Sequence, residues 1–296
     1  MVAIAQQYDA NGNRTSGGYK TGANNRLVYE GYYTYSYDKN GNRTAKFVDT
    51  NHSGKFDSGD GEGTVYGYDY RNRLSYVISE STYNTITQQV YYGYDYLNRQ
   101  IIKMKDNYPA DGNMDEYRYN VYQGADPVME IYDQDGLANN GYAGDISHIY
   151  LYGPGKDQII AVDSASGTLF GLADQEGTIR DVIRLDSPGN YSYWHRDYDS
   201  FGKVVYDDGP DYLFGKDGMA IDPDVYLYRT DSRLYDPLTA YWIKVDPSGF
   251  SSNDPNLYRF CGNDPYNKND STGKRWTDTV GTSLSVGSNY NQGMRS

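Results

Sequence analysis

The 296-residue sequence contains a single cysteine, Cys261, and no long apolar run. One cysteine excludes an intrachain disulfide, so we expect a small buried thiol at this position. A membrane-spanning helix needs about 20 consecutive apolar residues, and we therefore expect no membrane insertion. The first residues also lack the basic and apolar regions that mark a signal peptide.

Basic residues are scarce, with 27 Lys and Arg against 40 Asp and Glu and a net charge of −13. Nucleic acids and anionic lipids are bound by clustered Lys and Arg, so we expect no nucleic-acid partner. Phe and Trp are few, at 7 and 3, whereas tyrosine supplies 36 residues and suits sheets that are wetted on one face. With 33 glycines and no lasting helical period, the composition predicts an all-β protein.

A Tyr-Asp dipeptide followed by turn residues recurs along the chain. Internal repeats with a period of about 20–50 residues are typical of arrays in which each unit packs on its neighbour. Where Asn-Gly follows, we predict a type I′ turn with positive φ at both residues, and the flanking alternation predicts strands. Each dipeptide should therefore end one strand and begin the next, at Tyr8-Asp9, Tyr37-Asp38, Tyr68-Asp69, Tyr94-Asp95, Tyr132-Asp133 and Tyr198-Asp199.

A second set of motifs lies between residues 170 and 274. In order and spacing these motifs resemble the conserved core that ends the repeat region of RHS/YD-repeat proteins. That family includes bacterial polymorphic toxins, the shell subunit of insecticidal toxin complexes and animal teneurins. The motifs are Tyr198-Asp199-Ser200-Phe201-Gly202, Leu227-Tyr228-Arg229, Asp231-Ser232-Arg233-Leu234-Tyr235-Asp236-Pro237, Asp246-Pro247-Ser248-Gly249 and Asn269-Asp270-Ser271-Thr272-Gly273.

The resemblance implies three parts: a hairpin array over 1–169 with an irregular connection near 106–147, a core over 170–274, and a loosely ordered tail over 275–296. The expected fold is all-β, a curved or spiralling antiparallel sheet that is shell-like or barrel-like and is closed or plugged by the core. The expected function is a non-catalytic structural shell or scaffold, extracellular or at the cell surface, which encloses a cargo. Two alternatives stay open: a self-cleaving toxin-delivery protein whose toxin lies outside this sequence, and a calcium-dependent adhesion or carbohydrate-binding module.

The segment from residue 49 to residue 60 fits the template of a calcium-binding loop. Calcium prefers oxygen ligands, and a glycine at the sixth position lets the chain fold round the ion. Gly54 occupies that position, and Phe56 would anchor the loop in the core. The alternative is an Asp- and Gly-rich hairpin tip without an ion. The predicted Ca²⁺ ligands are Asp49, Asn51, Ser53, the carbonyl of Lys55, Asp57 and Asp60.

The resemblance also implies one chemistry, an aspartate-dependent self-cleavage just after the last motif of the core. Two carboxyl groups that share a proton could perform it, and the matching residues are Asp246 and Asp270. The sequence departs from the family pattern at three places: Tyr241 stands for an arginine, Ser271 for a proline, and Lys274 for the leucine before the cut. We therefore expect no enzyme activity beyond self-cleavage, which should be absent or slow.

Assembly is expected from the small number of repeats. Complete shells of the resembled family use many more hairpins than the six registers found here. Residues 1–44 contain no proline and only Lys20 and Lys39 as lysines, so nothing protects the edge of the first strands. We expect unpaired backbone groups near 8–44, and hence self-association or pairing with neighbouring YD repeats.

Overall fold

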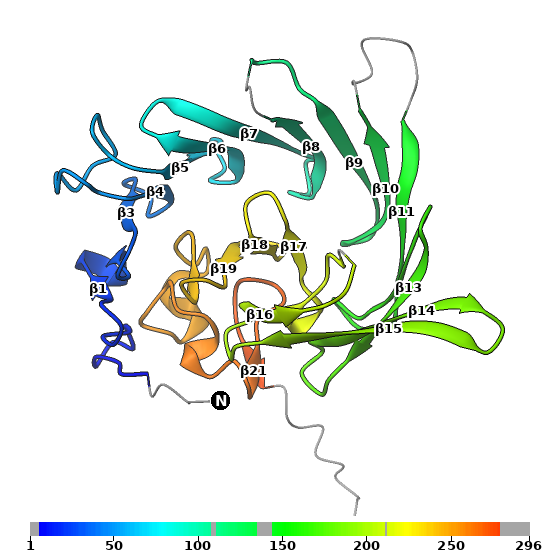
Figure 1. The fold of residues 1–296 in the computed structure, drawn as a ribbon. Coiled ribbons are helices and arrows are strands. Elements are labelled where there is room, and N and C mark those ends of the chain that lie inside the picture. Colours follow the sequence, from blue (N-terminus) through cyan, green and yellow to red (C-terminus); the bar gives the residue numbers. More distant parts are fainter. Residues whose placement is uncertain (1–5, 108–110, 135–143, 211, 279–296) are drawn as a thin grey trace, which may run out of the picture.

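The computed structural model describes residues 6–107, 111–134, 144–210 and 212–278. In these residues, 16 strands form one antiparallel sheet in sequence order. The sheet curves as an arc round the C-terminal part of the chain (Figure 1). Its strands are β1 (Lys20–Thr21), β2 (Leu27–Tyr29), β3 (Thr34–Tyr37), β4 (Arg43–Phe47), β5 (Gly63–Tyr68), β6 (Leu74–Thr82), β7 (Thr85–Tyr94), β8 (Gln100–Asp106), β9 (Glu116–Gln123), β10 (Asp126–Asp133), β11 (Asp145–Tyr152), β12 (Ile159–Ser164), β13 (Gly167–Ala173), β14 (Ile179–Ser187), β15 (Asn190–Tyr198) and β16 (Val204–Asp207).

The chain from residue 212 to residue 278 lies on the concave side of the sheet, and we call it the inner segment (Figure 1). It contains a four-stranded antiparallel sheet and a two-stranded one. Among the described residues, no helix is long and apolar enough to cross a membrane. The remaining elements are β17 (Ala220–Asp222), β18 (Leu227–Arg229), β19 (Leu234–Asp236), β20 (Tyr241–Trp242), β21 (Lys268–Asn269), β22 (Thr277–Asp278) and the 3-10 turns η1 (Ala23–Asn25), η2 (Lys216–Gly218), η3 (Gly249–Ser252) and η4 (Cys261–Asn263).

In the five registers whose turns are described, the aspartate of the Tyr-Asp dipeptide closes the turn that follows it. Asp38 Oδ1 accepts a hydrogen bond from the amide of Asn42 at 2.8 Å, and the backbone N–H of Asp38 donates to the carbonyl of Asn42 at 2.9 Å. Gly41 has a φ of 85°, whereas Asn40 does not have a positive φ. The prediction of a type I′ turn is therefore wrong: the side chain of the aspartate favours a longer turn with one left-handed residue and a bulge.

Neighbouring hairpins are joined by tyrosine hydroxyl groups that reach back across the sheet. The hydroxyl of Tyr68 donates to the carbonyl of Arg43 at 3.0 Å, and that of Tyr94 donates to the carbonyl of Leu74 at 2.8 Å. The guanidinium of Arg73 also lies 4.7 Å from the ring centre of Tyr94. The hairpin at Tyr68-Asp69 thus has both a polar contact and a cation–π contact with the next one, and in both contacts the partner is a tyrosine.

The hydrophobic core lies between the sheet and the inner segment. Three of the four buried clusters in the described residues contain several side chains of both parts, and the fourth contains one from the sheet, Phe201 in the turn between β15 and β16. In one of them, Leu27 and Tyr35 of the sheet pack against Tyr241 and Tyr258, with Tyr33 and Tyr37 at its margin. The remaining cluster centres on Tyr235, Trp242 and Phe260 and includes Cys261, which is buried. Neither part of the chain buries its apolar face without the other.

The expectation of an all-β chain with a curved antiparallel sheet is confirmed. The sheet is open, because in the described residues β1 and β16 pair on one side only. Two departures concern the boundaries. β9 and β10 lie inside the range 106–147, expected to be irregular, and β13 to β16 continue the large sheet across residue 170. The turn of the register at Tyr132-Asp133 and most of the tail lie outside the described residues.

The N-terminal edge is shorter than the sequence led us to expect. Residues 27–47 form β2 to β4, each paired with neighbours on both sides, so only β1 is left at this edge. The side chain of Asn256 donates to the carbonyl of Asn11 at 3.2 Å, and that of Asn263 donates to the carbonyl of Gly12 at 2.8 Å. The expectation of unpaired strands over 8–44 is therefore wrong, because the inner segment holds the first hairpin.

One buried ion pair joins the sheet to the inner segment. Nη1 of Arg43, in β4, lies 2.6 Å from Oδ2 of Asp236, in β19, and both side chains are almost fully buried. The amide of Arg43 also donates to the carbonyl of Ile243 at 2.8 Å. The ring of Tyr35 covers the guanidinium at 4.6 Å. A carboxylate in such a place is strongly destabilised if its cation is removed.

We predict that Arg43→Met lowers the free energy of unfolding by roughly 3–5 kcal/mol, because Asp236 then stays charged and unpaired in the interior. Adding Asp236→Asn should restore much of this loss, since the amide is neutral and can still accept the hydrogen bond from Leu238. Urea unfolding of the two variants measures both effects. Arg184→Met is the control, because its pair with Asp186 lies at the surface and should contribute little to stability. A stable Arg43→Met variant would contradict the assignment.

Candidate functional site

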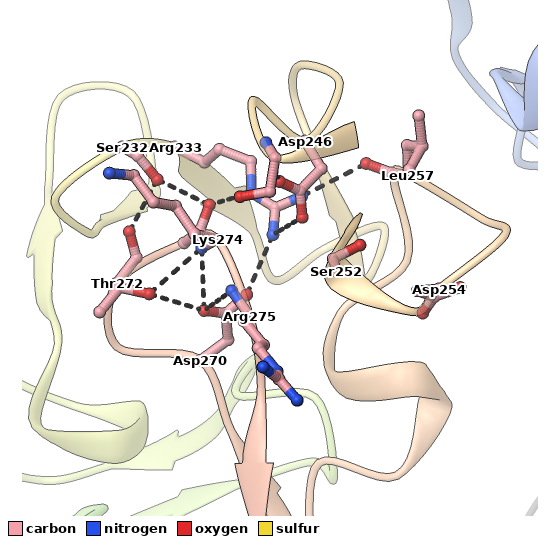
Figure 2. Close-up of polar contacts among 12 residues, drawn as sticks. Ser232, Arg233, Asp246, Ser252, Asp254, Leu257, Asp270, Thr272, Lys274 and Arg275 are labelled. Carbon is pink, nitrogen blue, oxygen red and sulfur yellow. Dashed lines mark hydrogen bonds and ion pairs between the residues drawn. The ribbon is translucent and has the colours of Figure 1, made fainter. Parts of the chain in front are cut away.

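Two aspartates from separate motifs meet at one arginine (Figure 2). Nη2 of Arg233, just before β19, lies 3.0 Å from Oδ2 of Asp246 and 3.0 Å from Oδ2 of Asp270. The two carboxylates are therefore within about 6 Å of each other. All three side chains are buried, with 4, 6 and 3% of their surface exposed. We call this group the aspartate–arginine cluster.

Local turns fix both carboxylates. Asp246 Oδ1 accepts the amide of Ser248 at 2.7 Å, and Asp270 Oδ1 accepts the amides of Lys274 and Arg275, each at 3.1 Å. Gly273 has a φ of 66°, and a Cβ atom there would lie 2.2 Å from Thr230 Oγ1. In each of the two glycine-containing motifs, the aspartate thus caps the turn that its own motif forms.

The guanidinium of Arg233 ties this cluster to two backbone carbonyls and one aromatic ring. Its Nε donates to the carbonyl of Gly273 at 2.5 Å and its Nη1 to that of Leu257 at 3.3 Å, while its plane lies 4.1 Å from the ring centre of Trp242. Burial lowers the pKa of Arg233, and the two carboxylates oppose this shift. Burial also raises the pKa of Asp246, which the charge of Arg233 counteracts.

The cluster has some of the parts that a self-cleavage reaction needs. Asp270 touches the amide nitrogen of Arg275, which belongs to the peptide bond after Lys274. A general acid must be protonated, however, and the charge of Arg233, 3.0 Å away, opposes the protonation of Asp246 that burial favours. In this arrangement the cluster is a clamp that holds the last motif against β19 and β20.

The structure brings Asp246 and Asp270 together, and their role in cleavage stays a prediction. Sequence reasoning missed Arg233, although a pair of buried aspartates in itself calls for a cation. Lys274 joins the cluster through its backbone amide. Tyr241 lies elsewhere, in the hydrophobic cluster with Leu27 and Tyr258, where it fills space between the sheet and the inner segment.

The predicted calcium loop connects β4 to β5 and curls on itself. Asp49 Oδ1 and Oδ2 accept the amides of Ser53 and Gly54, each at 3.0 Å, and Gly54 has a φ of 73°. Nδ2 of Asn51 donates to Asp57 Oδ1 at 2.6 Å. Oγ of Ser53 lies within hydrogen-bond distance of the carbonyl of Lys55 and of Asp57 Oδ2. Each of the six proposed ligand residues therefore contacts at least one of the others.

Two further residues set the position of this loop. Asp60, which is buried, accepts the amides of Thr50 and Asp57 at 3.1 and 2.9 Å. The ring of Phe56 lies 5.3 Å from that of Phe47, as expected for an anchor. Among the described residues, no three acidic, histidine or cysteine side chains are arranged to hold a metal. Asn51 and Ser53 instead satisfy Asp57 directly, and calcium binding here stays a prediction.

We predict that calcium stabilises the chain by replacing these internal hydrogen bonds with ion contacts. At a calcium concentration of about 100 times the dissociation constant, the gain would be about 2.7 kcal/mol. The melting temperature should therefore rise between excess chelator and millimolar calcium, and Asp49→Ala should remove the rise. Asp111→Ala, in the weaker echo of the motif at residues 111–115, serves as the control and should keep it. Equal melting temperatures of the unchanged protein in both buffers would refute the site.

We predict that the purified protein keeps its intact mass of 33.5 kDa, because Tyr241 and Lys274 stand where the family pattern has other residues. Mass spectrometry after expression and after long incubation checks this. A fragment that ends near Lys274 would show the prediction to be wrong. In that case Asp246→Asn or Asp270→Asn should stop the reaction, and Asp231→Asn, an acid outside the cluster, should not.

Comparisons with known proteins give structural relatives only. No family model matches the chain, and no curated protein does. Among solved structures, the chain is similar to TcdB2-TccC3, with a TM-score of 0.54 and 18% identity over 81% of this chain and 13% of that one. The chain is also similar to TcdB2-TccC3 with Cdc42, with a TM-score of 0.55 and 17% identity over 91% of this chain and 15% of that one. A third similar structure is the Photorhabdus luminescens Tc holotoxin pore with an aspartate-to-alanine mutation in TccC3. Its TM-score is 0.55, with 15% identity over 92% of this chain and 17% of that one.

The chain thus spans 13 to 17% of the length of these solved chains. At such identities the likeness concerns the fold. The curved sheet with its inner segment is of the kind found in chains of Tc toxin complexes, in agreement with an RHS/YD-like all-β fold.

Proposed function

We propose that this chain is a non-catalytic structural scaffold, a section of the wall of a β-shell of the RHS/YD-repeat type. The observation that carries the proposal is the single sheet of 16 strands, which follows the sequence order and curves round the inner segment (Figure 1). Such a sheet can be extended hairpin by hairpin without any change of design. Its concave side is already lined by the inner segment.

The contacts between hairpins support this proposal. The bond from the hydroxyl of Tyr94 to the carbonyl of Leu74 is repeated one hairpin later, where Tyr122 donates to the carbonyl of Gln100 at 2.9 Å. Arg99 covers the ring of Tyr122 as Arg73 covers that of Tyr94. A wall in which each hairpin depends on its neighbour keeps its curvature as it grows.

We infer an extracellular or cell-surface location and an enclosed cargo.

The wall is completed by other chains or by neighbouring YD repeats. Its two edges are β1 and β16, and β16 is the longer one. On β16, Val205 and Tyr206 are 56 and 51% exposed. A strand with free backbone groups and exposed apolar side chains is a site of pairing with another strand. We infer that β16 of one copy pairs with the edge strand β1 of the next.

A second candidate function is the delivery of a polypeptide released by self-cleavage. One observation favours it: Asp270 contacts the amide of Arg275, and Asp246 lies beside it on the same guanidinium. The intact-mass measurement described above separates the two functions. An uncleaved chain is a scaffold alone, whereas release of the segment after Lys274 indicates delivery.

We predict that the purified chain forms hollow particles heavier than the 33.5 kDa monomer at micromolar concentration. Light scattering gives the mass, and electron microscopy gives the shape. Val205→Lys should shift the particles towards monomer, because a lysine on an edge strand opposes pairing. Val121→Lys, at an exposed valine of β9 in the middle of the sheet, should leave the mass unchanged. A compact monomer in all three samples would refute the scaffold assembly.

A further inference from the structure

Two cavities lie between the large sheet and the inner segment. One has a volume of about 950 Å³ and is lined by the turns near residues 68–74, 94–100, 122–127 and 152–157, together with the inner segment; we call it the loop-end cavity. The other, of about 820 Å³, lies further along the strands. Both volumes are within the range of small-molecule sites, which is about 300–1,000 Å³.

The lining of the loop-end cavity is basic, although the whole chain carries a charge of −13. Eight lysines and arginines face it, against three aspartates. Four of these cations are paired with carboxylates: Arg73, Arg99, Lys156 and Arg233. The other four form no ion pair with any carboxylate of the described residues. They are Arg71, Arg229, Lys244 and Lys274.

The other cavity provides an internal comparison. Its lysines and arginines, apart from Arg229, are matched by carboxylates within the same lining: Lys103 and Lys105 with Asp224, Arg118 with Glu130, and Arg196 with Asp207. The interface thus neutralises its buried charge in one cavity and leaves it unmatched in the other. The excess of cations is specific to the loop-end cavity.

Arg229 is the centre of this excess. It is partly buried, lies at the end of β18 and lines both cavities. Within the described part of the chain its guanidinium makes no hydrogen bond or ion pair. The charged or ionisable groups that act on it are Tyr122, Tyr152, Asp222 and Tyr150, and Asp222 is already paired with Lys103. Because Arg229 is only partly buried and forms no ion pair, a bound anion could reach it and supply the charge-assisted contacts that it lacks.

Lys244 shows the same lack of negative charge. Its Nζ donates to the carbonyl of Asn72 at 3.0 Å, and it has no carboxylate partner. Burial lowers the pKa of Lys244 to about 8, and the charge of Arg233 adds to this effect. An anion beside Lys244 would favour the protonated amine.

We propose that the loop-end cavity binds a small multivalent oxyanion, a ligand with phosphate or carboxylate groups, through Arg229, Lys244 and Lys274, with Arg71 at its mouth. Arginine suits such groups because its planar fork makes paired, charge-assisted hydrogen bonds. The rings of Tyr94, Tyr122 and Tyr152 give the same cavity an apolar wall for the rest of the ligand. The site is independent of the scaffold function.

Isothermal titration calorimetry with pyrophosphate and with citrate, at constant ionic strength, tests this proposal. We expect sub-millimolar binding of at least one of them, weakened about tenfold or more by Arg229→Met and by Lys244→Gln, as for the loss of a charge-assisted contact. Pyrophosphate binding alone identifies a phosphate ligand, and citrate binding identifies a carboxylate ligand. Arg184→Met, far from the cavity on β14, should bind as the unchanged protein does.

Thermal unfolding without anion shows whether each variant folds. If Arg229→Met does not fold, Lys244→Gln and Lys274→Gln decide, since Lys274 is exposed and its loss leaves the core intact. Failure of both anions to bind the unchanged protein would overturn the proposal. Binding that is the same in the cavity variants and in Arg184→Met would overturn it as well.

Discussion

The arrangement of this protein depends on burying charge between a curved sheet and the segment that the sheet surrounds. Arg43 pairs with Asp236, Lys103 with Asp222, and Lys216 of the inner segment with Glu176 in the turn between β13 and β14. Apolar contacts alone, such as those of Tyr66 and Leu227, would allow the two parts to slide. A displaced ion pair leaves two unpaired charges in the interior, so these pairs oppose every other placement of the sheet on the inner segment.

The turns of the sheet follow a second constraint, which is local. Asp69 Oδ1 accepts the amides of Arg71 and Arg73, each at 2.9 Å, and its Oδ2 binds the side chain of Arg73. That arginine then covers the tyrosine of the next hairpin. One motif of a few residues thus forms its own turn and also orients the next strand pair. A sheet built from such units can continue through local contacts alone. Its position on the inner segment, in contrast, depends on contacts between residues far apart in the sequence.

This division explains what could be predicted from the sequence. The Tyr-Asp registers correctly predicted hairpins at Tyr37, Tyr68, Tyr94 and Tyr198, because the signal is local. The turn type was missed since the Asn-Gly pattern was given more weight than the capping side chain of Asp38. β9 and β10 were missed because Gly124-Ala125 joins them in place of the motif. The pairing of Arg43 with Asp236, and that of Arg233 with two aspartates, joins residues far apart in sequence, which spacing does not reveal.

The interior shows two outcomes of the same physical problem. Where the inner segment provides carboxylates, as Asp222 and Asp224 do for the lysines of β8, the charges of the sheet are neutralised and the interface is self-sufficient. Where β18 instead presents Arg229 to the turns of the sheet, its guanidinium forms no ion pair with a carboxylate of the described residues. A buried cation that only holds the fold together would be expected to have a partner, as Arg43 and Arg233 have. Arg229 has no such partner among the described residues, and the proposed oxyanion site rests on this difference between Arg229 and the paired arginines.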